Sequence, residues 1–332
     1  MSELTFGAGL FPIQPPREML DLVQLADKAG YTHIWLGDSQ LIWREVYVNL
    51  GAAAMVTERA VLAQGVTNPL TRHITVTASA LATLSELTGG RVAMGIGAGD
   101  SSVETWGARP ATMAQLGAAV RTVRSLLAGE HVQMSHGEAH LTWVKPLKMP
   151  LFVAGSGPKI LRVAGQVADG AIILVGVAPE YVQAAIEAIR EGAREVGRDL
   201  EAEGFQFVLW TPVSIDKDGQ KARDAVKAHV ARVLKRPLPF TLTDPDREVQ
   251  RRIYAEYEYY EHMVVGTHHG DIVPDELVSR FAIAGTVEEC REQVERLKET
   301  DLNQIAIIPH TPDPRDRLEL LSTFADKIAA RV

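Results

Sequence analysis

Short apolar runs alternate with longer amphipathic segments along nearly the whole chain. Residues 15–30 (PPREMLDLVQLADKAG) place leucine, valine and alanine at helical spacing after two prolines and before a glycine, which predicts a helix. Segments such as HIWLG and RVAMGIG are short, apolar and bounded by turn-forming residues, so they predict strands. We expect eight strands, which begin near Leu4, His33, Arg59, Arg91, Pro150, Gly170, Phe205 and Asn303.

This alternation predicts repeated strand–helix units. Eight such units in 332 residues favour an α/β fold of the (β/α)8 TIM-barrel type. The alternative is a doubly wound, Rossmann-like sheet, because GIGAG at residues 95–99 is similar to a dinucleotide-binding turn. GIGAG lacks the third glycine at the required spacing, however, and the next helix begins only near Thr112. We therefore predict the barrel.

Two segments do not fit the repeating unit. We interpret the chain as one domain over residues 1–332, with insertions at about 130–145 and 236–276. The second insertion begins as a long irregular and charged stretch and contains YAEYEYYEHMVVGTHHGD, which is too aromatic and apolar for a disordered linker. It is interpreted as a lid or a partner surface, with helical packing as the alternative.

Composition excludes several classes of protein. The net charge of −8 and the lack of any lysine or arginine run argue against nucleic acid as a partner. No apolar stretch approaches the roughly 20 residues that span a bilayer, and the first residues do not resemble a secretory signal, so we expect a cytoplasmic protein with no membrane partner. The single cysteine, Cys290, is expected to be a packed or partly exposed thiol. No metal site is predicted, and His268–His269 is expected at the surface.

Glycines and small polar residues gather where the predicted strands end. Catalytic residues of such barrels lie at the carboxyl ends of the strands. Glycine there lets a flat ligand lie against the backbone and leaves amide N–H groups available, although a tight turn is the alternative reading for any one loop. Gly155, Ser156 and Gly157 precede a predicted helix, so their amides and the Ser156 hydroxyl are placed to hold a phosphate, and Lys159 adds charge.

Polar and aromatic residues in the same loops are candidates for chemistry. The polar candidates are Asp38, Ser39, Arg72, His73 and Asp100. Asp100 has an alternative role as the cap of the turn that leads into SSVETWG. Trp43 and Trp106 are candidates for packing at the rim or for contact with a ligand.

With these residues in place, nearly the whole chain resembles the luciferase-like flavin-dependent oxidoreductases. The similarity rests on ADKAGYTHIWLGDS, GVTNPLTRH, ATLSELTGGRVAMGIGAGDSSV, AGSGPKILRVAGQVADGAI and FAIAGTVEEC. This superfamily of barrels includes FMN-dependent monooxygenases and enzymes that use the deazaflavin coenzyme F420. Several of the segments are similar to methylenetetrahydromethanopterin reductase.

The resemblance implies a cofactor site. It places a non-prolyl cis peptide bond between Gly65 and Val66, behind the flavin ring, with Thr67 and Asn68 facing the ring. It places the polar edge of the ring near Ala98, Gly99 and Asp100. The phosphate is then surrounded by Gly155, Ser156, Gly157, Gly176 and Val177.

The chain departs from the family pattern at two positions. Ser39 stands where many members have histidine, and Gly9 stands where the reductase has glutamate. Both changes remove a group that exchanges protons, so we expect that the chain does not reduce methylenetetrahydromethanopterin.

The resemblance leaves three hypotheses. The first is an FMNH2-dependent two-component monooxygenase, which oxidises a small organic substrate with O2 and receives reduced FMN from a separate NAD(P)H flavin reductase. The second is a coenzyme F420-dependent reductase or dehydrogenase, in which Ser39, His73 or Asp100 is the proton partner and Trp43 lines the substrate pocket. The third is a barrel that binds a flavin or a partner without catalysis. A homodimer is expected from the resemblance.

Overall fold

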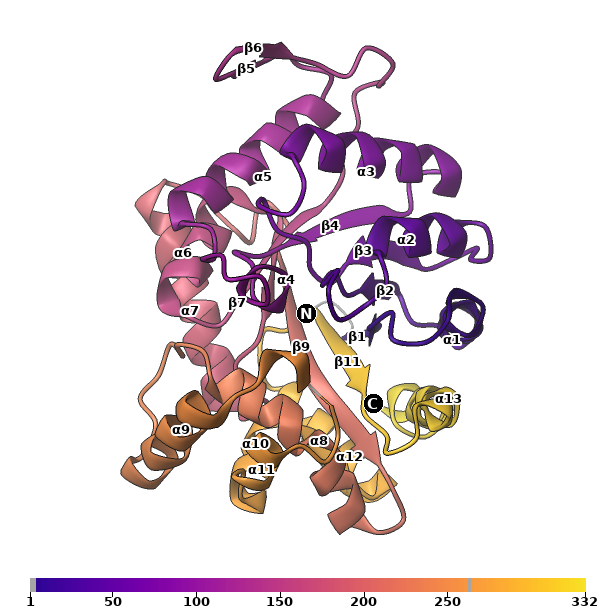
Figure 1. Cartoon of the computed structure of the whole chain (residues 1–332), viewed down its shortest axis with the longest axis vertical. Helices are drawn as coiled ribbons and strands as arrows, with labels where there is room; N and C mark the ends of the chain where they lie inside the picture. Colours follow the sequence, from indigo (N-terminus) through magenta and orange to yellow (C-terminus); the bar gives the residue numbers. More distant parts are fainter. Residues whose placement is uncertain (1–3, 262–263) are drawn as a thin grey trace.

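The strands form a closed parallel barrel surrounded by helices (Figure 1). The computed structural model describes residues 4–261 and 264–332. The barrel strands are β1 (Thr5–Leu10), β2 (His33–Leu36), β3 (Val61–Gln64), β4 (Val92–Ile96), β7 (Leu151–Gly155), β8 (Gly170–Ile173), β9 (Gln206–Ile215) and β11 (Gln304–Pro309). The ring closes because β8 pairs with β9 and β11 pairs with β1. The (β/α)8 barrel is confirmed, and the Rossmann-like alternative is wrong.

Each barrel strand begins within two residues of its predicted start. The helices that cover the barrel are α1 (Pro16–Lys28), α2 (Val46–Ala54), α3 (Ile74–Thr88), α5 (Met113–Leu127), α6 (Pro158–Val167), α7 (Pro179–Glu195), α8 (Gly219–Leu234), α12 (Val287–Leu297) and α13 (Arg317–Lys327). Local sequence explains their starts: α5 and α12 open with capping boxes at Thr112 and Thr286, and proline occupies the first turn of α1, α6 and α7.

Side chains point alternately outward and inward along each barrel strand, which separates two hydrophobic cores. Side chains on the outer face of the strands pack under the helices, and those on the inner face fill the barrel. Inside, the large rings of Trp35, Phe152 and Trp210 fit beside the small side chains of Ala63 and Ala306. The Trp35 indole N–H donates to Oε1 of the buried Gln304 at 3.0 Å, which satisfies the polar edge of that ring.

Two glycines set the position of α6. A Cβ on Gly165 would lie 2.0 Å from the carbonyl oxygen of Ile189, and one on Gly192 would lie 2.1 Å from that of Arg162. The backbones of α6 and α7 therefore meet directly at this crossing. This packing fixes the helix whose N-terminus faces the mouth of the barrel.

The segment at 130–145 contains an antiparallel hairpin of β5 (Val132–Met134) and β6 (Gly137–Ala139), which stands away from the barrel (Figure 1). The segment at 236–276 is more regular than expected. It contains α9 (Asp244–Glu256), η1 (Tyr259–Glu261), α10 (His268–Asp271) and the start of α11 (Asp275–Phe281), so the expectation of an irregular stretch is wrong there. Residues 262–263 lie outside the described residues.

Apolar contacts hold these helices on α8. Val230 and Leu234 of α8 pack in one buried cluster with Ile253 and Leu277 of the inserted helices. Arg280 donates from both Nη atoms to the carboxylate of Asp246, at 2.8 and 2.9 Å. The guanidinium of Arg280 lowers the pKa of Asp246. The short strand β10 (Ile283–Gly285) then pairs with the far end of β9.

Two expectations about single residues are resolved here. Cys290 is fully buried, as expected, and burial raises the pKa of its thiol to about 12. His268 is exposed, but His269 is buried, so placing both histidines at the surface was wrong. The reason is the close packing of α10 on α8, where a Cβ on Gly270 would lie 3.1 Å from the Ala228 nitrogen.

Over the described part of the chain, none of the helices combines the length and the apolar character that crossing a bilayer requires. Within the same residues, no group of three or more histidine, cysteine, aspartate or glutamate side chains is arranged to hold a metal ion.

Candidate functional site

A cavity of about 560 Å³ lies where the barrel strands end. Its wall combines backbone from the loops after β3, β4 and β7 with aromatic side chains from β9 and from the loops after β1 and β2. The predicted residues on the wall include Trp43 and, from the loops, Gly65–Thr67, Ala98–Asp100 and Gly155–Gly157. Sequence reasoning therefore located the loops that form the glycine-lined part of this cavity.

The loop after β7 forms one end of the cavity. A Cβ on Gly155 would lie 2.2 Å from Cγ2 of Ile160, so only glycine fits there. Gly157 is the N-cap residue of α6, no side chain caps this helix end, and Pro158 occupies its first turn. The first-turn N–H groups and the positive end of the helix dipole therefore lie at the cavity wall. Ser156 and Lys159 lie on the same wall, so this end is suited to an anion.

The loop after β4 forms a second, glycine-lined wall. Gly99 has a φ of +97°, and a Cβ there would lie 2.8 Å from Cγ2 of Val103. The Ala98 carbonyl accepts a hydrogen bond from the Ala111 N–H at 2.7 Å, which fixes the loop. A flat ligand can therefore approach the backbone closely on this side.

The peptide bond between Gly65 and Val66 is cis, as the resemblance implied. A Cβ on Gly65 would lie 2.7 Å from Cη2 of Trp210, so the indole fills the space behind this bond. The Thr67 N–H donates to the Gly95 carbonyl at 2.9 Å and joins the loop after β3 to β4. The two loops thus form one continuous surface.

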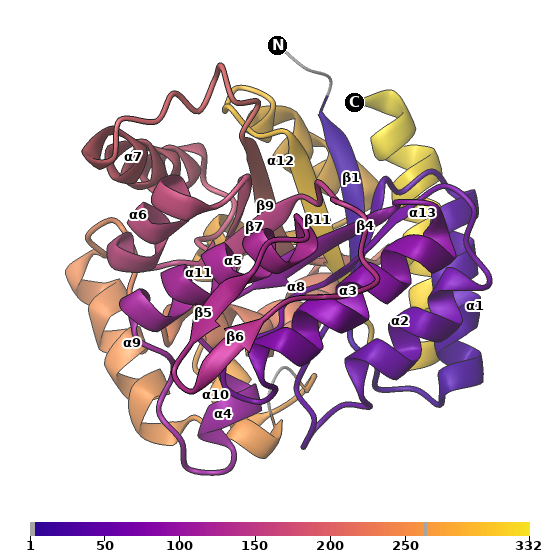
Figure 2. The ribbon, with the colours of Figure 1, turned by 90° about the horizontal axis from the view of Figure 1, so that it is seen from above.

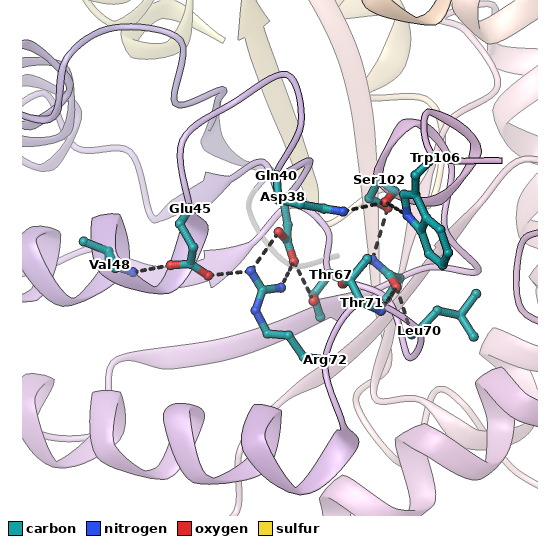
Figure 3. Close-up of polar contacts among 11 residues, drawn as sticks. Asp38, Gln40, Glu45, Val48, Thr67, Leu70, Thr71, Arg72, Ser102 and Trp106 are labelled. Atoms are coloured by element: carbon teal, nitrogen blue, oxygen red, sulfur yellow. Dashed lines mark hydrogen bonds and ion pairs between the residues drawn. The ribbon is translucent and has the colours of Figure 1, made fainter. Parts of the chain in front are cut away.

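A buried ion pair supports this surface (Figure 3). The Asp38 carboxylate lies on the cavity wall with its side chain 1% exposed, and it accepts from Thr67 Oγ1 at 2.8 Å and from Arg72 Nη1 at 2.6 Å. Arg72 also pairs with Glu45, and it lies over the ring of Tyr47 at 4.7 Å. Burial disfavours the charged form of Arg72, which lowers its pKa, but the Asp38 carboxylate outweighs that effect. The pKa of Arg72 is therefore raised.

Asn68 shapes the loop instead of lining the cavity. Its Oδ1 accepts from the N–H groups of Leu70 and Thr71 at 2.9 and 3.0 Å, and its Nδ2 donates to Ser102 Oγ at 3.1 Å. The Ser102 carbonyl in turn accepts from the indole of Trp106 at 2.9 Å (Figure 3). The polar atoms of Asn68 therefore hold the turn, and the expectation that this residue faces a flavin ring stays a prediction.

Ser39 and His73, both predicted as catalytic, also lie off the cavity wall. The buried Ser39 hydroxyl is 2.8 Å from that of Ser101. His73 is exposed and caps α3, since its Nδ1 accepts from the Thr75 N–H at 3.4 Å. The structure corrects both placements: the serine is turned toward a neighbouring loop, and the histidine is committed to a helix end.

Gly176 and Val177 were predicted beside the phosphate, but they do not line the cavity. A Cβ on Gly176 would lie 2.6 Å from the Arg280 carbonyl oxygen, and the Val177 N–H donates to that oxygen at 2.8 Å. The loop after β8 is therefore packed against α11, which the sequence pattern did not reveal.

Asp100 is held by arginines. It begins the short helix α4 (Ser101–Glu104), but its side chain makes no capping hydrogen bond, so the capping alternative is wrong. Its carboxylate instead pairs with Arg232 and Arg236, and Glu104 also pairs with Arg236 at 2.7 Å. These ion pairs join the loop after β4 to the end of α8 across the cavity wall.

Sequence reasoning missed the aromatic side of the cavity. Phe11 stacks on Trp43 with ring centroids 4.3 Å apart and planes 12° apart, and Trp210 lies beside Phe11 at 6.3 Å. A Cβ on Gly9 would lie 2.8 Å from the Trp210 ring, so this indole occupies the space next to the position where the resemblance implied a glutamate in the reductase. Strand alternation in FQFVLWTPVSI could have identified Trp210 as an inward residue.

His229, Arg232 and Arg236 of the cavity wall were also missed. Their spacing of three and four residues places them on one face of α8 and its C-terminal extension. This spacing was the available signal, but nothing in the sequence indicates which face of the helix meets the cavity.

The chain belongs to the luciferase-like monooxygenase family, whose model matches residues 4–304. A curated relative is 5,10-methylenetetrahydromethanopterin reductase of Methanopyrus kandleri, 27% identical with 97% of each chain covered. Another is F420-dependent glucose-6-phosphate dehydrogenase of Beutenbergia cavernae, 29% identical over 96% of this chain and 94% of the relative. The solved coenzyme F420-dependent tetrahydromethanopterin reductase from Methanopyrus kandleri superposes with a TM-score of 0.79, at 25% identity, covering 99% of each chain.

These similarities establish an oxidoreductase of this family. They also favour the deazaflavin hypothesis over the FMN monooxygenase hypothesis that the sequence analysis put first, because the names of these full-length relatives include F420-dependent enzymes.

Proposed function

We propose that this protein is a coenzyme F420-dependent reductase or dehydrogenase that transfers hydride to or from a small organic substrate. The observation that carries the proposal is the cavity at the strand ends, which joins a glycine-lined wall to the N-terminus of α6. Similarity to F420-dependent enzymes over almost the full chain supports the choice of cofactor.

The residues present fit a deazaflavin. Glycine keeps the wall open at two positions where a side chain would occupy the space for a ligand. A Cβ on Gly97 would lie 3.2 Å from Val66, and a Cβ on Gly155 would lie 2.2 Å from Ile160. Gly65 and Val66 would support one face of the ring system, and the first turn of α6 with Ser156 would hold the phosphate. Bound F420 supplies a carbon, C5, that accepts or donates hydride.

The aromatic side of the cavity would receive the substrate. Phe11, Trp43 and Trp210 exclude water and present apolar surface, while the nearby carboxylates of Asp38 and Asp100 are paired with arginines. A small molecule with limited charge suits this surface. Gly9 offers no carboxylate, so we propose a substrate other than methylenetetrahydromethanopterin.

The second candidate function is an FMNH2-dependent monooxygenase with a separate NAD(P)H flavin reductase as its partner. The match to the model of luciferase-like monooxygenases favours it, and the anion site at α6 suits the phosphate of FMN equally well.

Cofactor binding distinguishes the two functions. We expect anaerobic titration of the purified protein, followed by absorbance and fluorescence, to give at least 10-fold tighter binding of F420 than of FMN. Reduced forms of both cofactors are titrated in parallel. Tight binding of reduced FMN alone, with a long-lived oxygen adduct on admission of air, would reject the F420 proposal.

We also propose that two copies of the chain associate through α2 and α3, which pack side by side on the outside of the barrel (Figures 1 and 2). The sequence of α2 has no charged residue and that of α3 has one, yet Val48, Met55 and Val76 are more than half exposed. A neutral patch of this kind suits contact with the same patch on a second copy.

Light scattering after size exclusion tests the dimer. The wild type is expected at twice the monomer mass, and Val48→Asp with Val76→Asp is expected at the monomer mass, because burying two carboxylates in an apolar interface is costly. Val196→Asp, at an equally exposed valine after α7, is the control and should stay dimeric. A monomeric wild type would contradict the proposal.

A further inference from the structure

Two buried histidines meet at the cavity. His229 of α8 lies on the cavity wall and is 1% exposed, and His310, which follows β11, is 3% exposed. His229 Nδ1 lies 2.9 Å from His310 Nε2, with the rings nearly perpendicular. The backbone of His310 is fixed because its N–H donates to the Val213 carbonyl at 2.8 Å.

One of the two facing nitrogens must carry the hydrogen. Burial, and then the positive charge of Arg317, lower the pKa of His310 to about 3, so His310 is neutral at physiological pH. A neutral imidazole has one N–H and one bare nitrogen. If His310 presents bare Nε2, then His229 donates from Nδ1, and proton exchange between His229 and a ligand involves its Nε2.

Four other polar groups near the mouth have described partners of their own. Asp38 pairs with Arg72, and Asp100 pairs with arginines of the α8 end. The Ser39 hydroxyl faces Ser101, and His73 caps α3 away from the cavity. Among the described residues that line the cavity, the histidine is His229.

We propose that His229 exchanges a proton with a hydroxyl or carbonyl oxygen of the substrate, and that His310 is a positioning residue that keeps hydrogen on His229 Nδ1. The proposal rests on the proposed F420-dependent function. In the oxidative direction, an alcohol loses its O–H proton to His229 Nε2 and its C–H hydride to the deazaflavin, while the carbonyl bond forms. The reverse direction returns both to a carbonyl compound.

The tautomers can be measured without any cofactor. Long-range ¹H–¹⁵N spectra of histidine-labelled protein at pH 7.5 distinguish protonated from bare ring nitrogens, and His229→Gln and His310→Gln assign the signals. We expect hydrogen on His229 Nδ1 and a bare His229 Nε2. His310→Gln, whose amide oxygen can still accept, should preserve this state, whereas His310→Leu should lose it. A wild-type signal with hydrogen on His229 Nε2 would overturn the proposal.

Kinetics test the chemical role separately. With F420 bound and cyclohexanol or cyclohexanone as the probe, His229→Gln should slow hydride transfer about 100-fold while the Kd for F420 stays within about twofold. His310→Leu should slow it about 10-fold, and His310→Gln should recover most of that loss. His136→Gln, on the exposed turn of the β5–β6 hairpin, is the control. Full activity of His229→Gln would reject the proton role.

The two proposals fail differently. A wild type that does not bind F420 would reject the proposed function, and the tautomer of His229 would still decide whether His310 positions it. If F420 binds but neither probe is turned over, hydride transfer to or from a simple alcohol or carbonyl compound is rejected, and the tautomer measurement still decides whether His310 positions His229.

Discussion

Replacing Ser156 and Gly157 together with glutamate is expected to weaken F420 binding about 1,000-fold and to leave the fold intact. Both residues lie on the cavity wall at the start of α6. The change removes the Ser156 hydroxyl as a donor, and one charge-assisted hydrogen bond contributes about 1.5–3 kcal/mol, which corresponds to a factor of roughly 10–100. Two carboxylates at the same place also repel the phosphate.

The fold should tolerate this change. Gly157 has a φ of −76°, which any residue adopts, and acidic side chains are favourable at a helix N-terminus. A Cβ there would meet Pro237 at 3.2 Å, which requires only a small shift. Fluorescence titration gives the Kd, and thermal unfolding checks the fold.

A double substitution with glutamine separates charge from bulk. Ser156→Gln with Gly157→Gln occupies the same volume, but its amides can donate to phosphate, so its loss of affinity should be much smaller. If the folded glutamate variant binds F420 as tightly as the wild type, the phosphate is held elsewhere and the placement at α6 is wrong.

The barrel could be predicted because its signals are local. Short apolar runs, amphipathic helices and proline or threonine starts are readable within a few residues, and eight of them in series define the architecture. The helices within 236–276 were missed for the opposite reason. Arg247 and Arg251 give α9 a highly polar sequence, and its place in the fold is set by distant partners such as Arg280.

The backbone part of the site could be predicted, whereas its side-chain part could not. Glycine at Gly97, Gly99 and Gly155 reports close packing directly in the sequence. The partner of a polar side chain is a long-range property: Asp100 was a candidate for chemistry or for a helix cap, but Arg232, 132 positions away, pairs with it. His229 and His310 lie 81 positions apart and carry no shared motif.

Replacing Arg72 with leucine is expected to lower the free energy of unfolding by about 3 kcal/mol, because it leaves a buried carboxylate without its cation. Asp38 is 1% exposed at the side chain, and its remaining described hydrogen bond comes from Thr67. Thr67 itself lines the cavity, so affinity for F420 should fall together with stability. Urea unfolding measures the first effect and titration the second.

A second substitution shows whether the unpaired charge is the cause. In Asp38→Asn with Arg72→Leu no carboxylate is left uncompensated at position 38, so this double variant should be more stable than Arg72→Leu alone. Arg194→Leu is the control: Arg194 pairs with Glu187 at the surface, and loss of such a pair costs about 0–1 kcal/mol. A double variant less stable than Arg72→Leu would contradict this explanation, because the Asp38 carboxylate would then stabilise the fold without its arginine.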